Sequence, residues 1–242
     1  MAIAELRAVL LDMGGVILRM AGGHGFPNDR LDWRGREALL RGSGCRRRLT
    51  MDDLESLVFG PWLQAYERRE ETGVEADWTP HLDRLRSHCG TQLDDRQLLE
   101  AWFRPYGEQL EPVEGAREVL DELQDMGLKL ALVSNVPLPG ELYREVLELH
   151  GLEAPFDSLC FSYDRGTRKP SPALLRLALG ELAVGPGSAV MVGDRRERDI
   201  LAGQVAGTRT VWIRGSDAGG GEADAAIASL GELPGLLRRW QR

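Results

Sequence analysis

The chain contains two kinds of hydrophobic pattern, one typical of buried strands and the other typical of helices. Short apolar runs, each followed by turn residues, occur at residues 8–12, 128–133, 189–192 and 210–213. Such runs are typical of strands that are buried on both faces of a parallel sheet. A shorter strand is expected at 156–162, where apolar residues alternate less regularly with polar ones.

Helical patterns separate these runs after residue 111. Apolar residues recur there at three- and four-residue spacings, as in Val119, Leu120 and Leu123. Alternating strands and helices over 111–237 predict right-handed βαβ units and a parallel sheet. The first strand has no other partner, so we expect it to join this sheet. The glycine-rich stretch 215–221 is expected to be a loop.

Residues 21–105 have a different pattern, with no run typical of a buried strand. Thr50 and Asp53 resemble a capping box, and the spacing that follows predicts a helix over 51–71, kinked or split at Pro61. Shorter helices are expected further along. The sequence therefore predicts an α/β protein with a Rossmann-like parallel sheet and an inserted α-helical domain. The core domain would comprise residues 1–20 and 106–242, and the inserted domain residues 21–105.

Reactive side chains follow four of the predicted strands. In a parallel sheet the carboxyl ends of the strands meet at one edge, which is where ligands bind in open α/β sheets. The residues are Asp12, Ser134, Asn135, Lys169, Asp194 and Asp199.

Together these groups favour transfer of an anionic group with a divalent cation. Asp12 and Asp194 offer the hard oxygen ligands that Mg²⁺ prefers. Ser134 could hydrogen-bond phosphate oxygens, and Lys169 supplies a positive charge. Asp12 could attack phosphorus and form an aspartyl-phosphate. Each residue alone is more typical of a turn or a helix cap, so the interpretation depends on their joint placement.

These motifs resemble those of the haloacid dehalogenase superfamily of phosphatases, in the subgroup with a helical cap after the first strand. The resemblance covers residues 8–20 and 111 to about 235. It implies that Asp12 is the nucleophile and that Ser134 and Asn135 bind phosphate. It also implies that Lys169 is both catalytic and phosphate-binding. Asp194 and Asp199 then complete, with Asp12, a Mg²⁺ site.

One position departs from the phosphatase pattern Asp-x-Asp. The second Asp, which acts in the family as general acid and base, is replaced by Gly14. The family uses the backbone carbonyl at this position as a metal ligand, and glycine retains it. The proton-transfer role is lost, and such a role typically contributes about 10²–10⁴-fold to the rate.

The motifs and this departure leave three hypotheses for the function. The leading hypothesis is a Mg²⁺-dependent phosphatase that acts on a small phosphate ester. A metal-independent 2-haloacid dehalogenase would use the same nucleophile, although Asp194 argues against it. A catalytically weak binding or regulatory protein is the third, and Gly14 favours it.

Composition indicates which partners and which cellular compartment to expect. The net charge of −8 does not favour nucleic-acid binding, and no apolar run is long enough for a membrane span. We expect a cytoplasmic monomer or homodimer with a small phosphorylated substrate. Cys45, Cys89 and Cys160 are expected to be free thiols. Arg195, Arg196 and Arg198 are expected to be solvated, and so are the arginines at 46–48, for which contact with an anionic substrate is the less favoured alternative.

Overall fold

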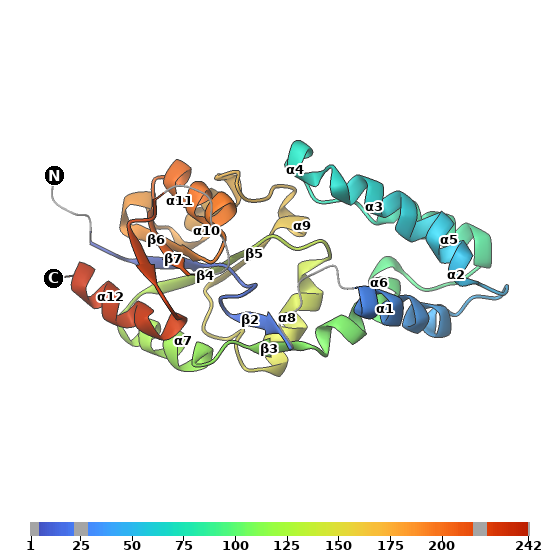
Figure 1. The fold of residues 1–242 in the computed structure, drawn as a ribbon, viewed down its shortest axis with the longest axis horizontal. Coiled ribbons are helices and arrows are strands. Elements are labelled where there is room, and N and C mark those ends of the chain that lie inside the picture. Colours follow the sequence, from blue (N-terminus) through green and yellow to red (C-terminus); the bar gives the residue numbers. More distant parts are fainter. Residues whose placement is uncertain (1–4, 22–28, 215–221, 242) are drawn as a thin grey trace.

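A six-stranded sheet forms the centre of the molecule (Figure 1). The computed structural model describes residues 5–21, 29–214 and 222–241. The strand order is β5-β4-β1-β6-β7-β8, and all neighbouring strands are parallel. In chain order the strands are β1 Ala8–Leu11, β4 Lys129–Ser134, β5 Ser158–Phe161, β6 Ala189–Gly193, β7 Arg209–Ile213 and β8 Ala225–Ile227.

Both faces of this sheet are covered by helices. Successive side chains of a strand point to opposite faces, so Leu10 and Leu11 of β1 belong to different apolar clusters. The cluster of Leu11 includes residues of α7, α8 and α12, and the cluster of Leu10 includes residues of α10 and α11. These helices are α7 Ala116–Asp125, α8 Gly140–Leu149, α10 Ala173–Leu182, α11 Leu201–Ala206 and α12 Leu233–Trp240. The predicted α/β class is confirmed.

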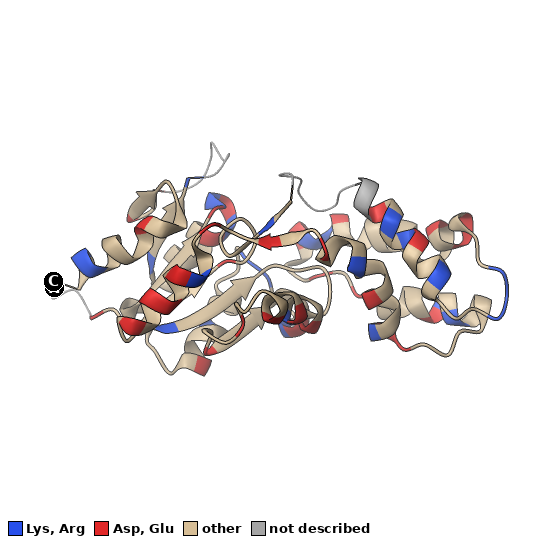
Figure 2. Ribbon diagram, turned by 90° about the horizontal axis from the view of Figure 1, so that it is seen from below, with Lys and Arg blue, Asp and Glu red and all other residues tan. Residues whose placement is uncertain are grey.

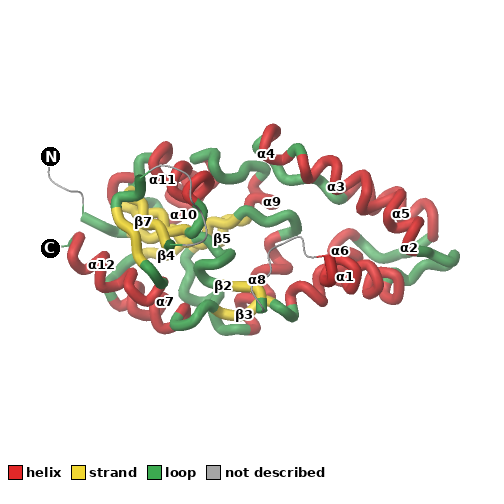
Figure 3. Tube along the Cα trace, viewed as in Figure 1, coloured by secondary structure: helices red, strands yellow, loops and turns green. Residues whose placement is uncertain are grey.

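Residues 29–107, here called the helical region, extend away from the sheet (Figures 1 and 3). The predicted helix over 51–71 is divided, because a π-helical turn at Glu55–Phe59 precedes Pro61 near the start of α3. The capping box of Thr50 and Asp53 is present as predicted. The helices are α1 Asp29–Gly42, α2 Met51–Leu54, α3 Gly60–Glu67, α4 Arg69–Thr72, α5 Thr79–Cys89 and α6 Asp95–Gly107.

Aromatic side chains fill the core of the helical region. The ring of Trp62 stacks on that of Trp78 with centroids 4.0 Å apart, and Phe59 and Trp102 surround the pair. Such rings bury a large apolar area each, which explains how a group of short helices can hold together.

A disulfide joins Cys45 to Cys89, so the prediction of three free thiols was wrong for this pair. Only Cys160 is a free, buried thiol. The sequence places the two bonded cysteines 44 residues apart, and they meet because Cys45 follows α1 while Cys89 ends α5. Sequence spacing cannot reveal such a meeting.

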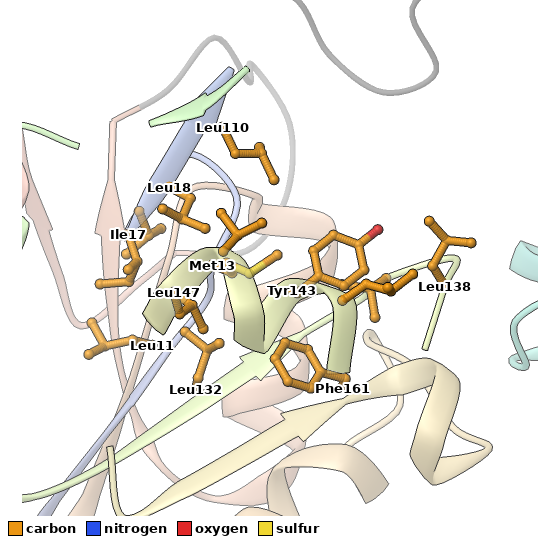
Figure 4. Packing of buried hydrophobic residues seen from close by; sticks show 14 of the residues in the cluster. Leu11, Met13, Ile17, Leu18, Leu110, Leu132, Leu138, Tyr143, Leu147 and Phe161 are labelled. Carbon is orange, nitrogen blue, oxygen red and sulfur yellow. The ribbon is translucent and has the colours of Figure 1, made fainter. Parts of the chain in front are cut away.

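A two-stranded antiparallel ribbon lies between the sheet and the helical region. It pairs β2, Leu18–Met20, with β3, Leu110–Pro112. Neither strand was predicted, because three residues are too few to show an alternating pattern. Figure 4 shows Leu18 and Leu110 in one apolar cluster with Tyr143 of α8. The ribbon is therefore anchored to the core of the sheet.

The structure differs from one further prediction, the start of the helix after Lys169. The pair Lys169-Pro170 and the apolar spacing that follows it predict a helix that opens at Lys169, but α10 begins at Ala173. The predicted loop at 215–221 lies outside the described residues. None of the helices in the described part of the chain combines the length and apolarity that crossing a membrane requires.

Candidate active site

The reactive side chains meet at the carboxyl edge of the sheet, as predicted from their strand positions. Asp12 follows β1, Ser134 ends β4, and Asp194 follows β6. A cavity of about 680 Å³ opens there. Its lining includes all the residues that the sequence singled out, namely Asp12, Gly14, Ser134, Asn135, Lys169, Asp194 and Asp199.

Lys169 lies between two carboxylates. Its Nζ is 2.7 Å from Asp12 Oδ1 and 2.5 Å from Asp199 Oδ1, and only 1% of its side chain is exposed. Burial by itself lowers the pKa of Lys169, but the charges of Asp12 and Asp199 outweigh burial, so the pKa is raised. Lys169 therefore remains a cation at neutral pH.

Three carboxylates form a cluster that is suited to a cation. Asp12, Asp194 and Asp199 each offer an oxygen, and these atoms lie within 4.8 Å of one another. Burial, followed by the charges of Asp12 and Asp199, raises the pKa of Asp194 to about 7. Asp194 Oδ1 is buried and has no hydrogen-bond partner among the described residues. An oxygen with this need fits a hard divalent cation such as Mg²⁺.

Two glycines allow the carboxylates to approach the backbone. Gly15 has a φ of +77°, and a Cβ there would lie 2.6 Å from Asp194 Oδ2. A Cβ on Gly193 would lie 2.3 Å from the Cβ of Asp199. Gly14 differs, because a Cβ there would meet nothing within 4 Å among the described residues. The position that departs from the phosphatase pattern therefore has room for a side chain.

The side chain of Asn135 holds the backbone of Lys169. Its Nδ2 donates to the backbone carbonyl of Lys169, and its Oδ1 accepts from the backbone N–H of Lys169, both at 2.8 Å. The amide that was expected to bind phosphate is thus engaged with the backbone of Lys169. The sequence could not reveal this contact, which joins residues 34 positions apart.

Further residues line the cavity that the sequence analysis did not assign to it. Tyr66 comes from α3, Tyr106 from α6 and Tyr143 from α8. Burial raises the pKa of each of these tyrosines, so all three stay neutral. Helical spacing of aromatic residues is more often a sign of core packing, so no sequence signal distinguished them.

Of the arginines that follow Asp194, Arg195 is exposed as predicted, whereas Arg196 and Arg198 are half-buried. Arg195 and Arg198 line the cavity, and Arg195 Nε is 3.8 Å from Asp194 Oδ2. Arg196 stacks its guanidinium over the ring of Trp212 at 3.8 Å. Their position directly beside Asp194 was the signal that could have identified them.

The second arginine cluster behaves as expected. Residues 46–48 are exposed and are not among the residues that line the cavity. In Figure 2 the loop between α1 and α2, blue for basic residues, lies at the end of the helical region farthest from the sheet.

Comparison with protein families identifies the chain. Residues 6–207 match the family model described as haloacid dehalogenase-like hydrolase. The chain belongs to this family. The resemblance inferred from the residues at the strand ends is therefore confirmed, and the protein is a haloacid dehalogenase-like hydrolase.

Relatives of this hydrolase include phosphatases. It is 32% identical to a phosphoserine phosphatase from Thermus thermophilus over 86% of this chain and 88% of the relative. It is 30% identical to a ribulose-1,5-bisphosphate 5-phosphatase from Halopiger xanaduensis over 76% of this chain and 84% of the relative.

Solved structures agree on the fold of this hydrolase. A haloacid dehalogenase (HAD) phosphatase from Thermococcus onnurineus superposes with a TM-score of 0.62 at 26% identity, over 96% of this chain and 98% of that one. A 2-haloacid dehalogenase from Pseudomonas syringae has the same fold, with a TM-score of 0.65 at 20% identity over 97% of this chain and 99% of that one.

Proposed function

We propose that this hydrolase is a Mg²⁺-dependent phosphatase that acts on a small phosphate ester through an aspartyl-phosphate. One observation carries the proposal: the buried cation Lys169 contacts two members of the carboxylate cluster, while the buried Oδ1 of Asp194 has no hydrogen-bond partner among the described residues. A phosphoryl group needs positive charge at such a site, and a metal-independent reaction would leave Asp194 without a purpose. The phosphatases among the relatives support the same conclusion.

The proposed steps divide among the chain's own residues. An oxygen of Asp12 attacks phosphorus, the bond from phosphorus to the ester oxygen breaks, and the alcohol leaves with a proton from water. A second water then attacks phosphorus and releases phosphate, which restores the Asp12 carboxylate. Lys169 offsets charge on Asp12 and the phosphoryl oxygens, and Ser134 donates a hydrogen bond to them.

Four groups would hold the metal. They are the carboxylates of Asp12, Asp194 and Asp199 and the backbone carbonyl of Gly14. Bound Mg²⁺ would supply the positive charge that draws the phosphoryl group and the carboxylates together.

Substrate choice is assigned to the helical region as a cap domain. Tyr66 and Tyr106 bring side chains from this region into the cavity. The sequence placed the domain boundary at residues 105 and 106, but α6 continues to Gly107. We therefore propose that the cap ends after Gly107 rather than within α6.

The test is an activity screen with Mg²⁺ or EDTA on purified wild-type protein and on Asp12→Asn. The substrates are a panel of phosphate monoesters, with phosphoserine included, and 2-chloropropionate. We expect phosphate release that requires Mg²⁺ and is lost in Asp12→Asn, while circular dichroism shows the fold of the variant to be intact. Wild-type turnover in Asp12→Asn would exclude Asp12 as the nucleophile.

Two other outcomes would replace the proposal. Chloride release that persists in EDTA would identify a dehalogenase. Absence of turnover with every substrate, together with measurable binding of a phosphate ester, would identify a binding protein.

A further inference from the structure

One carboxylate of the helical region contacts two loops of the proposed catalytic site. Glu70, on the short helix α4, has Oε2 2.8 Å from Arg168 Nη1 and Oε1 3.1 Å from Arg198 Nη2. Arg168 and Arg198 are far apart in sequence and follow different strands of the sheet. Glu70 therefore connects two loops that are distant in sequence.

Each of these arginines directly precedes a residue of the proposed catalytic site. Arg168 is followed by Lys169, and Arg198 is followed by Asp199. Lys169 Nζ and Asp199 Oδ1 are themselves 2.5 Å apart. The same two loops are thus connected twice. The buried ion pair of Lys169 and Asp199 connects them within the site, and Glu70 connects them from the helical region.

The arginine that precedes Lys169 is firmly fixed. Only 3% of the Arg168 side chain is exposed, and its Nε donates to Glu75 Oε1 at 2.9 Å. Glu75 also accepts from Ser162 Oγ at 2.7 Å. Arg198 is less buried, with 34% of its side chain exposed, so its position depends more on Glu70.

The segment around Glu70 is also joined to the cavity wall. Arg69 places its guanidinium over the ring of Tyr66 at 3.5 Å, and Tyr66 lines the cavity. Trp78 Nε1 donates to the carbonyl of Pro137, in the loop after β4. A shift of this segment would therefore displace residues at the ends of several strands.

We propose that Glu70 is a positioning residue that couples the helical region to the loops of Lys169 and Asp199. The kinetic part of this proposal rests on the proposed phosphatase function. Burial raises the pKa of Glu70, but contact with Arg168 and the charge of Arg198 outweigh burial and lower the pKa. Glu70 is therefore ionised at neutral pH, when both ion pairs form.

The test compares Glu70→Gln with Glu71→Gln, which removes the same charge from the exposed neighbouring residue. Hydrogen exchange is followed in peptides that cover 166–172 and 195–201, and kcat and KM are measured with the best phosphate ester of the activity screen. In Glu70→Gln we expect faster exchange in both peptides and a fall in kcat of about tenfold, because reacting groups lose their alignment. Glu71→Gln should match wild type in both measurements.

A double-variant cycle separates positioning from a loss of stability. If Glu70 acts through Arg198, combining Glu70→Gln with Arg198→Gln should lower kcat no further than the worse of the two single variants. A loss of stability by two independent routes would instead multiply the two effects.

The outcomes that overturn the proposal are distinct from failure of the proposed function. Unchanged exchange in Glu70→Gln overturns it, whatever the activity, and so do fully multiplicative effects in the cycle. If wild type hydrolyses no phosphate ester, the proposed function fails. Faster exchange confined to the two peptides of Glu70→Gln would then still support the positioning role.

Discussion

The carboxamide of Asn135 hydrogen-bonds to both backbone groups of Lys169, the N–H and the carbonyl, at 2.8 Å each. This pair of bonds fixes the backbone from which the Lys169 side chain reaches Asp12 and Asp199. The loop after β4 thereby sets the position of a cation that belongs to a different loop.

Asn135→Ala should lower both activity and stability. Without the amide, the buried backbone groups of Lys169 lose their partners, which costs about 1–3 kcal/mol in the free energy of unfolding. We expect kcat/KM to fall by about tenfold or more, because Lys169 is less well held. Urea denaturation and steady-state kinetics measure the two effects.

Gln124→Ala is the matched control for Asn135→Ala. Gln124 Nε2 donates to the carbonyl of Pro155 at 3.0 Å, outside the set of residues that line the cavity. This variant should lose some stability and keep its kcat/KM. Equal kinetic losses in both variants would show that Asn135 has no special connection to Lys169.

Gly14→Asp should accelerate hydrolysis of esters with poor leaving groups. A Cβ at this position meets nothing within 4 Å among the described residues, so the new carboxylate has room to donate a proton to the leaving alcohol. A general acid typically contributes about 10²–10⁴-fold, and we expect the lower end of this range with alkyl phosphates. Esters such as 4-nitrophenyl phosphate, whose leaving group needs no proton, should gain little.

Two variants control for the added side chain. Gly14→Asn has nearly the same shape and cannot transfer the proton, so it should show no acceleration. Gly15→Ala should lose activity, because its Cβ would lie 2.6 Å from Asp194 Oδ2 and φ is +77°. An unchanged rate in Gly14→Asp would mean that another group already supplies the proton.

Asp194 should make the metal-free protein less stable as pH rises. Its folded-state pKa, raised to about 7, exceeds the ordinary value of 3.8. The protonated carboxyl is therefore favoured by folding. This contribution is fully present below about pH 4 and is lost as pH rises through 7.

Asp194→Asn should abolish the loss of stability at high pH, because the amide does not ionise. In EDTA at pH 8 we expect the variant to be more stable than wild type by about 1–2 kcal/mol, with a smaller difference at pH 5. Adding Mg²⁺ should stabilise wild type and leave the variant unchanged, which reverses their order. Thermal unfolding at the two pH values measures this, and an unchanged order after Mg²⁺ would contradict a metal role for Asp194.

Reduction of the disulfide should destabilise the helical region selectively. A bond that closes a loop with a sequence separation of 44 typically contributes about 2–4 kcal/mol. Reduction with dithiothreitol should speed hydrogen exchange in α1 and α5 and leave β1 and β6 unchanged. Cys45→Ser should reproduce the effect without reductant. Equal protection of α5 before and after reduction would contradict the prediction.

The sheet and the convergence of the reactive groups were predictable from sequence, because both follow from local patterns. A buried strand such as Ala8–Leu11 shows itself in an unbroken apolar run, and the parallel arrangement then brings Asp12 and Asp194 together. The family motifs depend on residues that act directly, and these are recognisable by type and spacing.

The remainder depends on contacts that no local pattern records. The side chain of Asn135 contacts the backbone of Lys169, 34 residues away, and no spacing in the sequence indicates that contact. Tyr66 and Glu70 lie in a helical region without recognisable motifs, and their roles arise from how that region docks on the sheet. The Cys45–Cys89 bond likewise depends on the meeting of two helix ends.

The ribbon of β2 and β3 brings the two ends of the helical region together. Ala21, which follows β2, donates its N–H to the carbonyl of Gln109, just before β3, at 2.8 Å. The chain thus leaves the sheet and returns to it at adjacent points, one hydrogen bond apart. A two-residue Asn-Gly turn in place of residues 22–108 would close the ribbon as a β-hairpin and leave the strand order of the sheet unchanged. Every side chain to which the proposed reaction assigns a step lies outside the segment that this turn would replace.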